Sequence, residues 1–310
     1  MQMRKLGSLE VSLIGLGCNN FGRRCDEGQT RAVVEAALEA GINFFDTSDS
    51  YGGTLSEQYL GKALGARRDE VVIATKFSSP IDDDPTHRGA SPAWIVQAVE
   101  GSLRRLGTDR IDLYQQHFPD AEVPIEATLE ALDRLVREGK VREIGCSNFS
   151  GQQIDQAASV AAEKGWTPFV SAQNQLNVLH RQPLDDVVPA CARHGLGFLP
   201  YFPLASGLLT GKYSRGKPPP EGTRLAGMPE ERASRLLSER NFARVEALTK
   251  FAESRGHTIL ELAIAWLAAQ PTMASVIAGA TRPEQVKANA KAVDWALTAE
   301  DLAEIDRLLE

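Results

Sequence analysis

The chain has 310 residues, of which 43% are hydrophobic and 24% charged, and its formal net charge is −7. This composition is typical of a globular protein, and an acidic chain without a cluster of Lys or Arg lacks the basic surface that binds nucleic acid or an anionic membrane. The four cysteines, Cys18, Cys25, Cys146 and Cys191, have neither metal-type nor disulfide-type spacing, and no segment resembles a signal peptide or a membrane span. We therefore expect a cytoplasmic protein without a metal, a nucleic-acid partner or a membrane partner.

Short apolar segments of strand character recur along the chain, and helical segments separate them. The segments predicted as strands are 11–17, 42–48, 71–77, 111–117, 141–148, 169–175, 197–204 and 275–281. Because most are apolar along nearly their whole length, we expect parallel strands that are covered on both faces. The first residues, 1–7, are expected to form a small cap across the floor of a barrel.

Several helical segments carry their own start and stop signals. Ser91 followed by Pro92 is an N-cap with proline at the first helical position. Thr258 with Glu261 forms a capping box ahead of an apolar helix. Gly139 is a natural stop for the helix that precedes it.

Eight strands, each followed by a helix, predict a (β/α)8 TIM-type barrel, an architecture that typically takes about 250 residues. The remaining residues predict a long insertion after strand 7, at 205–257 with a helical stretch near 230–254, and a C-terminal helix. A doubly wound open sheet is the alternative, but no Gly-x-Gly-x-x-Gly follows an early strand. No low-complexity linker interrupts the chain, so we expect 1–310 to form a single domain.

Polar side chains gather where the predicted strands end, at the face of such a barrel that carries the active site. In chain order they are Asp46, Tyr51, Lys76, His117, Ser147, Asn148, Gln173 and Asn174. Each of them alone has a structural explanation, such as a turn cap, a solvated strand end or a ring that covers the barrel rim. Their occurrence at successive strand ends favours one functional site.

A tyrosine, a lysine, an aspartate and a histidine together suit one kind of proton transfer. A free tyrosine has a pKa near ~10, and an ammonium group beside it lowers that pKa, while a carboxylate keeps the lysine charged. The histidine can then orient a substrate oxygen by a hydrogen bond. Such a set can protonate an alkoxide as it forms, which is what hydride addition to a carbonyl requires.

Three motifs at these positions resemble those of the aldo-keto reductases: FDTSDSYG at 45–52, ATK at 74–76 and DLYQQH at 112–117. The resemblance covers essentially the whole chain in order. It implies Tyr51 as the general acid, Lys76 and Asp46 as the residues that tune it, and His117 as the residue that orients the carbonyl.

The resemblance also implies a nicotinamide cofactor. Ser147, Asn148 and Gln173 resemble the residues that hold the nicotinamide carboxamide, and Tyr201 resembles the aromatic residue that stacks on the ring. The other residues implied at the cofactor are Cys18 and Asn19 near the nicotinamide, Phe202, Pro203, Leu204 and Lys212 over the pyrophosphate, Arg224 from the insertion, and Gly279, Thr281, Arg282, Gln285 and Asn289 at the adenosine end.

Arg282 is the reason to prefer NADP(H) over NAD(H). It precedes a predicted helix, and a helix N-terminus with an arginine suits the 2′-phosphate. The chain departs from the family pattern in two places. Phe202 stands where the family usually has serine, and Ala288 stands where a glutamate is often seen, so each change removes one cofactor contact.

The function predicted from these residues is NADPH-dependent reduction of aldehyde or ketone carbonyls, in which cofactor binding precedes closure of the 205–230 loop. One alternative is a Schiff-base aldolase that acts through Lys76, although Asp46 should keep this lysine charged. The other is a cofactor-binding regulatory module such as the potassium-channel beta subunits of this fold, although the intact His117 favours an enzyme. The candidates for the small-molecule substrate pocket are Phe21, Trp94, Phe118 and residues of the insertion, with core packing preferred for Trp94.

Overall fold

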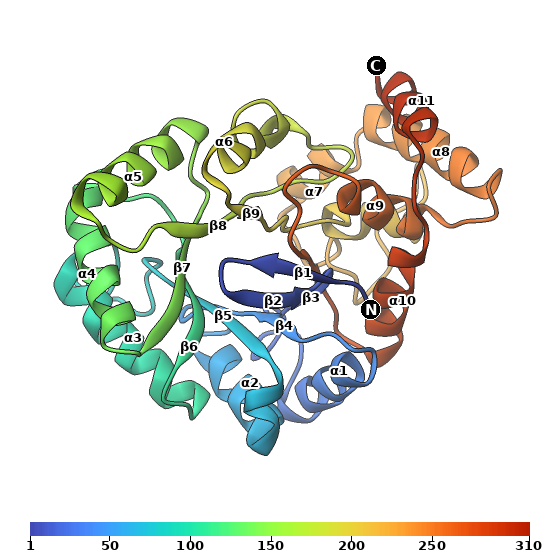
Figure 1. Cartoon of the computed structure of the whole chain (residues 1–310). Helices are drawn as coiled ribbons and strands as arrows, with labels where there is room; N and C mark the ends of the chain where they lie inside the picture. The colour runs from blue at the N-terminus through green and yellow to red at the C-terminus, as the bar shows by residue number, and fades with distance from the viewer.

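An eight-stranded parallel sheet forms the centre of the computed structural model, which describes residues 1–310 (Figure 1). The strands in chain order are β3 (Ile14–Gly17), β4 (Phe44–Asp46), β5 (Val72–Phe77), β6 (Ile111–Gln116), β7 (Val141–Ser147), β8 (Phe169–Gln173), β9 (Gly197–Phe198) and β10 (Val276–Gly279). Consecutive strands pair in parallel, and β10 pairs with β3. The backbone N–H of Phe198 donates to the Thr272 carbonyl at 2.8 Å, which joins β9 to the segment before β10. The predicted (β/α)8 barrel is confirmed.

Helices alternate with these strands and cover the outside of the barrel (Figure 1). They are α1 (Glu27–Glu39), α2 (Leu55–Leu64), α3 (Pro92–Leu106), α4 (Ile125–Arg137), α5 (Gly151–Lys164), α6 (Val187–His194), α7 (Glu230–Leu236), α8 (Glu239–Glu253), α9 (Ile259–Ala268), α10 (Pro283–Lys291) and α11 (Ala299–Leu309). Short 3-10 helices are η1 (Gly65–Glu70), η2 (Gln182–Leu184), η3 (Ala205–Thr210) and η4 (Ala292–Asp294).

The predicted helix signals act as expected. Ser91 accepts a hydrogen bond from the Trp94 backbone at 3.3 Å and starts α3. Thr258 and Glu261 form the reciprocal capping box of α9. Gly139 follows α4 with φ of +75°, a left-handed conformation that costs glycine little.

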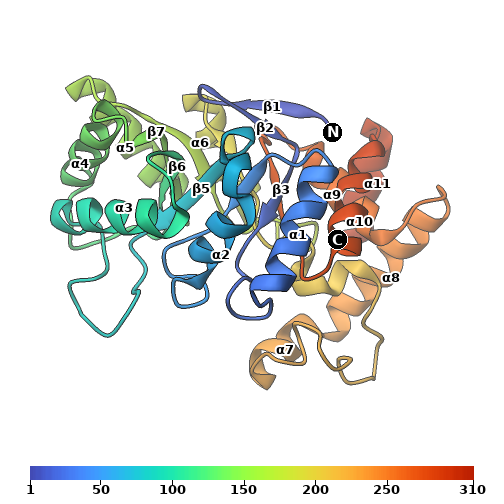
Figure 2. The same ribbon diagram turned by 90° about the horizontal axis from the view of Figure 1, so that it is seen from below.

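An antiparallel hairpin of β1 (Met3–Leu6) and β2 (Leu9–Ser12) closes one end of the barrel (Figure 2). Its buried Leu6 and Leu9 belong to the same apolar cluster as Phe44 of β4. The expected cap at the barrel floor is therefore present. The expected first strand over 11–17 is wrong in its extent, because the chain leaves the hairpin at Ser12 and enters the barrel at Ile14.

The expected strand over 197–204 is also too long, because β9 ends at Phe198. Pro200 and Pro203 have no N–H to donate to a neighbouring strand. The chain instead makes a single parallel bridge between Gln175 and Tyr201, and so it is free to turn into the insertion.

The insertion that follows β9 contains η3, α7 and α8. Its predicted helical stretch near 230–254 is two helices, because Ser238 caps α8 by accepting from the Asn241 backbone at 3.4 Å. The α7 helix lies at the end of the barrel opposite the hairpin (Figure 2). The insertion therefore covers the face of the barrel at which the candidate residues gather.

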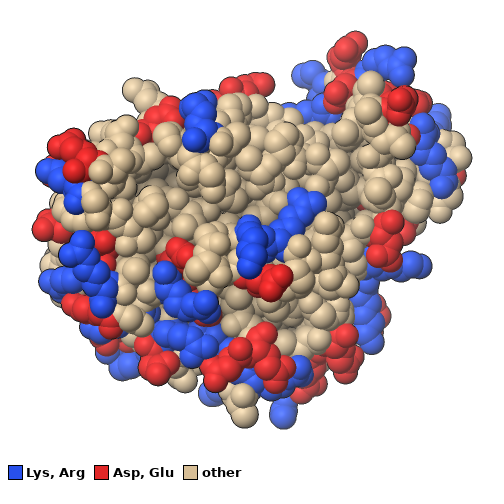
Figure 3. All heavy atoms as spheres, in the orientation of Figure 1, with Lys and Arg blue, Asp and Glu red and all other residues tan.

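Charges of both signs are interspersed on the hairpin face, with no large patch of one sign (Figure 3). Within the molecule, 69 buried residues form the main apolar cluster. No helix has the length and apolar character that crossing a membrane requires.

Candidate functional site

A cavity of about 910 Å³ opens at the C-terminal ends of the barrel strands and under the insertion. All the predicted catalytic and cofactor residues line it except Lys76 and Cys18. These two are fully buried behind the cavity wall, where the Cys18 backbone N–H donates to the Asp46 carbonyl at 2.8 Å. The structure thus brings together residues that are up to 271 positions apart in the sequence, from Cys18 to Asn289.

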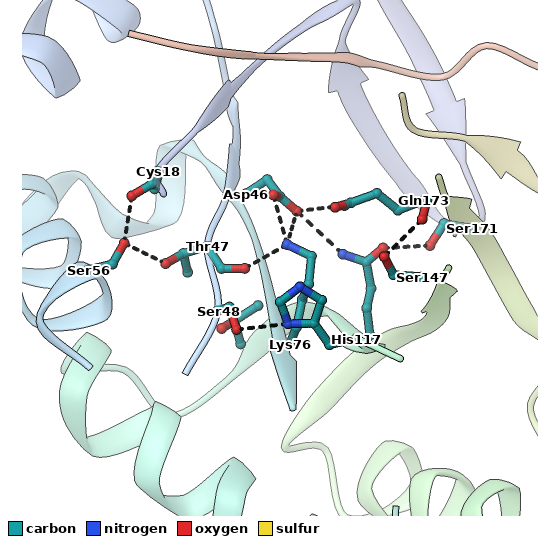
Figure 4. Close-up of polar contacts among 12 residues, drawn as sticks. Cys18, Asp46, Thr47, Ser48, Ser56, Lys76, His117, Ser147, Ser171 and Gln173 are labelled. Carbon is teal, nitrogen blue, oxygen red and sulfur yellow. Dashed lines mark hydrogen bonds and ion pairs between the residues drawn. The ribbon is translucent and has the colours of Figure 1, made fainter. Parts of the chain in front are cut away.

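Lys76 and Asp46 form a buried ion pair at the inner end of the cavity (Figure 4). Lys76 Nζ lies 2.7 and 2.8 Å from the two carboxylate oxygens of Asp46 and 2.8 Å from the carbonyl of Thr47. The side chains are 0% and 4% exposed. Burial acts to lower the pKa of Lys76, but Asp46 and then Tyr51 outweigh it, so the pKa is raised and the lysine stays charged.

Two glutamine side chains complete the surroundings of Asp46. Gln173 Nε2 donates to Asp46 Oδ1 at 2.8 Å, and Gln115 Nε2 lies 3.5 Å from the same oxygen. A buried carboxylate is tolerated when its oxygens are hydrogen-bonded in this way. Gln173 therefore holds the ion pair as well as lining the cavity, whereas Gln115 is a contact that the sequence pattern did not indicate.

Tyr51 lines the cavity in front of this pair, and Lys76 Nζ lies 5.2 Å from the centre of its ring. Burial raises the pKa of Tyr51, and the neighbouring Lys76 lowers it by less. The ammonium acts in the expected direction, but the expected net lowering of the pKa is not found. The phenol consequently keeps its proton at neutral pH, and Lys76 is placed to stabilise the phenolate once that proton leaves.

His117 lies beside Tyr51, with 5.7 Å between the ring centres. Burial, followed by the charge of Lys76, lowers the pKa of His117 to about 3. The imidazole is therefore neutral at neutral pH, and it has one nitrogen that donates and one that accepts. Its Nδ1 lies 3.3 Å from Ser48 Oγ and 3.0 Å from Ser79 Oγ, so serine hydroxyls set which nitrogen carries the proton.

Of the three aromatic residues expected near a substrate, the structure places only Phe118 on the cavity wall. It is 49% exposed and stacks on His117 with 4.7 Å between ring centres. Phe21 is fully buried in the core, so its candidacy is wrong. Trp94 is 4% exposed and packs in the core, as preferred for it from the sequence.

A polar cluster follows β7 at the side of the cavity. Asn148, in the left-handed conformation with φ of +60°, donates to the His117 carbonyl at 2.9 Å and to Ser147 Oγ at 3.1 Å. The Tyr201 hydroxyl donates to Asn148 Oδ1 at 2.8 Å. The side-chain amide of Asn148 and the ring of Tyr201 are therefore held in fixed positions before any ligand contacts them.

The other end of the cavity is strongly positive. Lys212, Arg224 and Arg282 line the cavity together with two cations that the sequence pattern did not indicate, Arg24 and Arg232; Glu221 and Glu284 also line it. Burial lowers the pKa of Lys212, and the charges of Arg24, Arg282 and Arg224 lower it further. None of these five cationic side chains has a carboxylate within 4.0 Å. Unpaired cations gathered in one cavity form a site for an anion.

The loop that carries Lys212 has an unusual backbone. Phe202, Ala205 and Ser206 have φ of 54°, 45° and 59°, a conformation that is costly for residues other than glycine and that is common at functional sites. A Cβ at Gly207 would lie 2.6 Å from Lys212 Nζ, and Gly207 has φ of +95°, so a glycine here lets the lysine lie against the backbone. The ring of Phe202 lies 4.9 Å from the Arg224 guanidinium. Phe202, which stands where the family usually has serine, therefore positions a cation.

The start of α10 forms the remaining wall. Arg282 occupies the N-cap position, and the helix continues with Pro283. Gln285 Oε1 accepts from the backbone N–H of Thr281 at 2.8 Å, and Asn289 lies one turn further along with 4% exposure. The Arg282 guanidinium at this helix start suits a phosphate group, although Gln285 occupies the Thr281 N–H and Pro283 has none.

A comparison with known protein families identifies one family that covers nearly the whole chain. The chain belongs to the aldo/keto reductase family, whose model matches residues 13–310. These are oxidoreductases that act on small molecules and generally use a nicotinamide cofactor.

Curated relatives of two kinds resemble the chain about equally. It is 36% identical over 309 residues to "Aldo-keto reductase YhdN" of Bacillus subtilis, and the match covers 97% of this chain and 91% of that protein. It is 37% identical over 305 residues to "Uncharacterized oxidoreductase YrpG" of the same organism, covering 95% and 91%. It is 35% identical over 301 residues to a "Probable voltage-gated potassium channel subunit beta" of Oryza sativa, covering 95% and 92%. Overall identity therefore does not separate the enzyme from the regulatory alternative.

Proposed function

We propose that the chain is an NADP(H)-dependent carbonyl reductase that converts aldehydes or ketones to alcohols. The observation that carries this proposal is the position of Tyr51 on the cavity wall, in front of the buried Lys76–Asp46 pair and beside the neutral His117. Proteins that share a fold can differ in function, so the site and not the barrel supports this proposal. Unpaired buried cysteines support a reducing cytoplasmic setting for a single-domain enzyme.

The cavity fits a long, anionic cofactor. Amide and aromatic side chains occupy one end near Tyr51, and five unpaired cations lie along the cavity, with Arg282 at the start of α10. Asn148, Ser147 and Gln173 would hold the carboxamide, Tyr201 would stack on the ring, and Lys212 and Arg224 would lie on the pyrophosphate. When bound, NADPH would supply the hydride.

The residues of the chain would then handle the substrate oxygen. His117 donates one hydrogen bond to it and fixes its orientation. Tyr51 donates the proton from its hydroxyl to the oxygen as negative charge develops there. The phenolate left behind is stabilised by the Lys76 ammonium, which Asp46 holds in place.

The two alternatives are less well supported. A Schiff-base aldolase needs a lysine of lowered pKa, whereas the pKa of Lys76 is raised and its three donor hydrogens face Asp46 and Thr47. A regulatory role like that named for the potassium-channel relatives is compatible with the same cofactor site. Measuring NADPH oxidation with a panel of aldehydes, ketones and keto-sugars distinguishes a reductase from a regulatory protein, because a purely regulatory protein binds NADPH without turnover.

Replacing Arg282 with Ala should weaken NADPH binding much more than NADH binding. A charge-assisted hydrogen bond to a phosphate contributes about 1.5–3 kcal/mol, so the dissociation constant of NADPH should rise roughly tenfold to a hundredfold. Fluorescence titration with both cofactors measures this. Arg31→Ala, which removes an exposed arginine of α1, is the matched control. Equal losses for the two cofactors would refute the assignment of Arg282 to the 2′-phosphate.

A further inference from the structure

A buried carboxyl group lies behind His117 and has no part in the proton transfer described above. Asp49 is 1% exposed, and its Oδ1 accepts a hydrogen bond from Ser48 Oγ at 3.1 Å. The same Ser48 oxygen lies 3.3 Å from His117 Nδ1 (Figure 4). One serine hydroxyl therefore links the Asp49 carboxyl to the imidazole that faces the candidate site.

Asp49 also lines a second cavity. Asp49 Oδ2 has no hydrogen-bond partner, and Asp49, Trp94 and Arg105 are among the residues that line a cavity of about 390 Å³. A buried polar atom without a partner is uncommon and calls for an explanation. Asp49 thus lies between the candidate site, which it reaches through Ser48, and the wall of the second cavity.

The charges around Asp49 favour its neutral form. Burial has the largest effect and the carboxylate of Glu57 in α2 adds to it, so the pKa of Asp49 is raised to about 8. Arg105 in α3 opposes this only in part, since it is paired with Glu57 at 2.6 Å. The other titratable groups near this network are Tyr114 of β6 and, at the second cavity, His87, Glu100 and Arg104, with Lys76 acting on His117.

The two forms of Asp49 bind Ser48 in opposite ways. A neutral carboxyl can donate its proton to Ser48 Oγ, which leaves the serine hydroxyl to donate to His117 Nδ1. The imidazole proton is then on Nε2. An ionised carboxylate can only accept, and its charge draws the Ser48 proton toward itself. Ser48 Oγ, which also accepts from the Ser50 backbone N–H at 3.3 Å and lies 3.1 Å from Ser50 Oγ, can then only accept from His117, which favours the proton on Nδ1.

We propose that Asp49 is a positioning residue that selects the tautomer of His117 through Ser48. The neutral acid favours the Nε2–H form, which has a proton to donate to a substrate oxygen. The effect on turnover rests on the proposed reductase function. The effect on the imidazole does not, because it exists in the protein without substrate.

The test is ¹⁵N NMR of the histidine side chains in the full-length protein between pH 6 and pH 10, with His117 assigned by its loss in His117→Gln. In the wild type we expect the Nε2–H tautomer below pH 8 and a growing Nδ1–H fraction above it. Asp49→Asn should keep the Nε2–H tautomer throughout, because its amide donates at every pH. Asp69→Asn, which removes the same charge from an exposed residue of η1, should behave as the wild type.

Two serine variants keep the test decisive if Asp49→Asn does not fold. Ser48→Ala should abolish the pH dependence of the tautomer, since it removes the link. Ser79→Ala should increase it, because Ser79 is the competing hydroxyl on the same nitrogen. A wild-type tautomer that does not change with pH, or a change that is equal in the wild type and in Ser48→Ala, would overturn the proposal. If the enzyme reduces carbonyls, kcat/KM should fall above pH 8 in the wild type and not in Asp49→Asn, and an unchanged alkaline decline in that variant would count against the proposal.

Discussion

Tyr51→Phe is expected to reduce kcat for carbonyl reduction by roughly a hundredfold to ten-thousandfold, the usual contribution of a positioned acid. The substitution removes only the hydroxyl, so the ring remains against His117 and beside Lys76. No other phenol in the site can replace it, since the Tyr201 hydroxyl is already donated to Asn148. Steady-state kinetics with saturating NADPH measures the effect.

Cofactor binding supplies the control for this prediction. The dissociation constant of NADPH should stay within about twofold of the wild type, because the hydroxyl of Tyr51 has no assigned contact with the cofactor, and a loss confined to kcat indicates an interaction made only in the transition state. Tyr59→Phe, the same chemical change on α2 outside the cavity, should retain full activity. Wild-type turnover in Tyr51→Phe would show that another group donates the proton.

The residues that could be predicted without the family resemblance stand at or shortly after the ends of apolar strands. Asp46, Lys76 and Gln173 follow β-type runs, and the barrel brings those ends to one face. Their convergence depends on the fold class alone. It was therefore predictable once the alternation of strands and helices had been recognised.

The residues that were missed depend on loop conformation or on side-chain direction. Arg24 and Arg232 reach the cavity from a turn after β3 and from α7, and neither lies at a strand end. The pair Arg23-Arg24 was the one local signal for the first of them. Gln115 is one residue from the end of β6, and only the register of the barrel shows that its side chain meets Asp46.

Strand lengths and pKa values also needed the structure. The predicted strand at 197–204 was shortened by Pro200 and Pro203, whose effect depends on which neighbours would have paired with them. The direction of the Tyr51 shift depends on the balance between burial and one ammonium group, and burial proved larger. A sequence pattern identifies the partners of a charge, but it does not give the degree of burial.

Asp46→Asn is expected to lower the free energy of unfolding by about 3–5 kcal/mol, the usual cost of breaking a buried ion pair. The change leaves the Lys76 ammonium fully buried without a counterion, while an amide of the same size can still accept from Gln173. Without Asp46 the pKa of Lys76 should fall, so the unfolded chain will bind more protons than the folded one between that lowered value and ~10.4. Stability should therefore rise with pH in this range, and the deficit of Asp46→Asn should shrink as the lysine becomes neutral.

The double variant Asp46→Asn/Lys76→Met distinguishes the contribution of the ion pair to stability, measured by denaturant unfolding, from its contribution to activity. Removing both charges should recover most of the lost stability, because the unpaired ion, and not the missing pair, carries the cost. Activity should remain absent, since no ammonium is left to stabilise the phenolate of Tyr51. A double variant as unstable as Asp46→Asn would mean that the pair is needed for folding. The expected recovery would mean that the barrel tolerates a buried charge pair for the sake of the proton transfer at Tyr51.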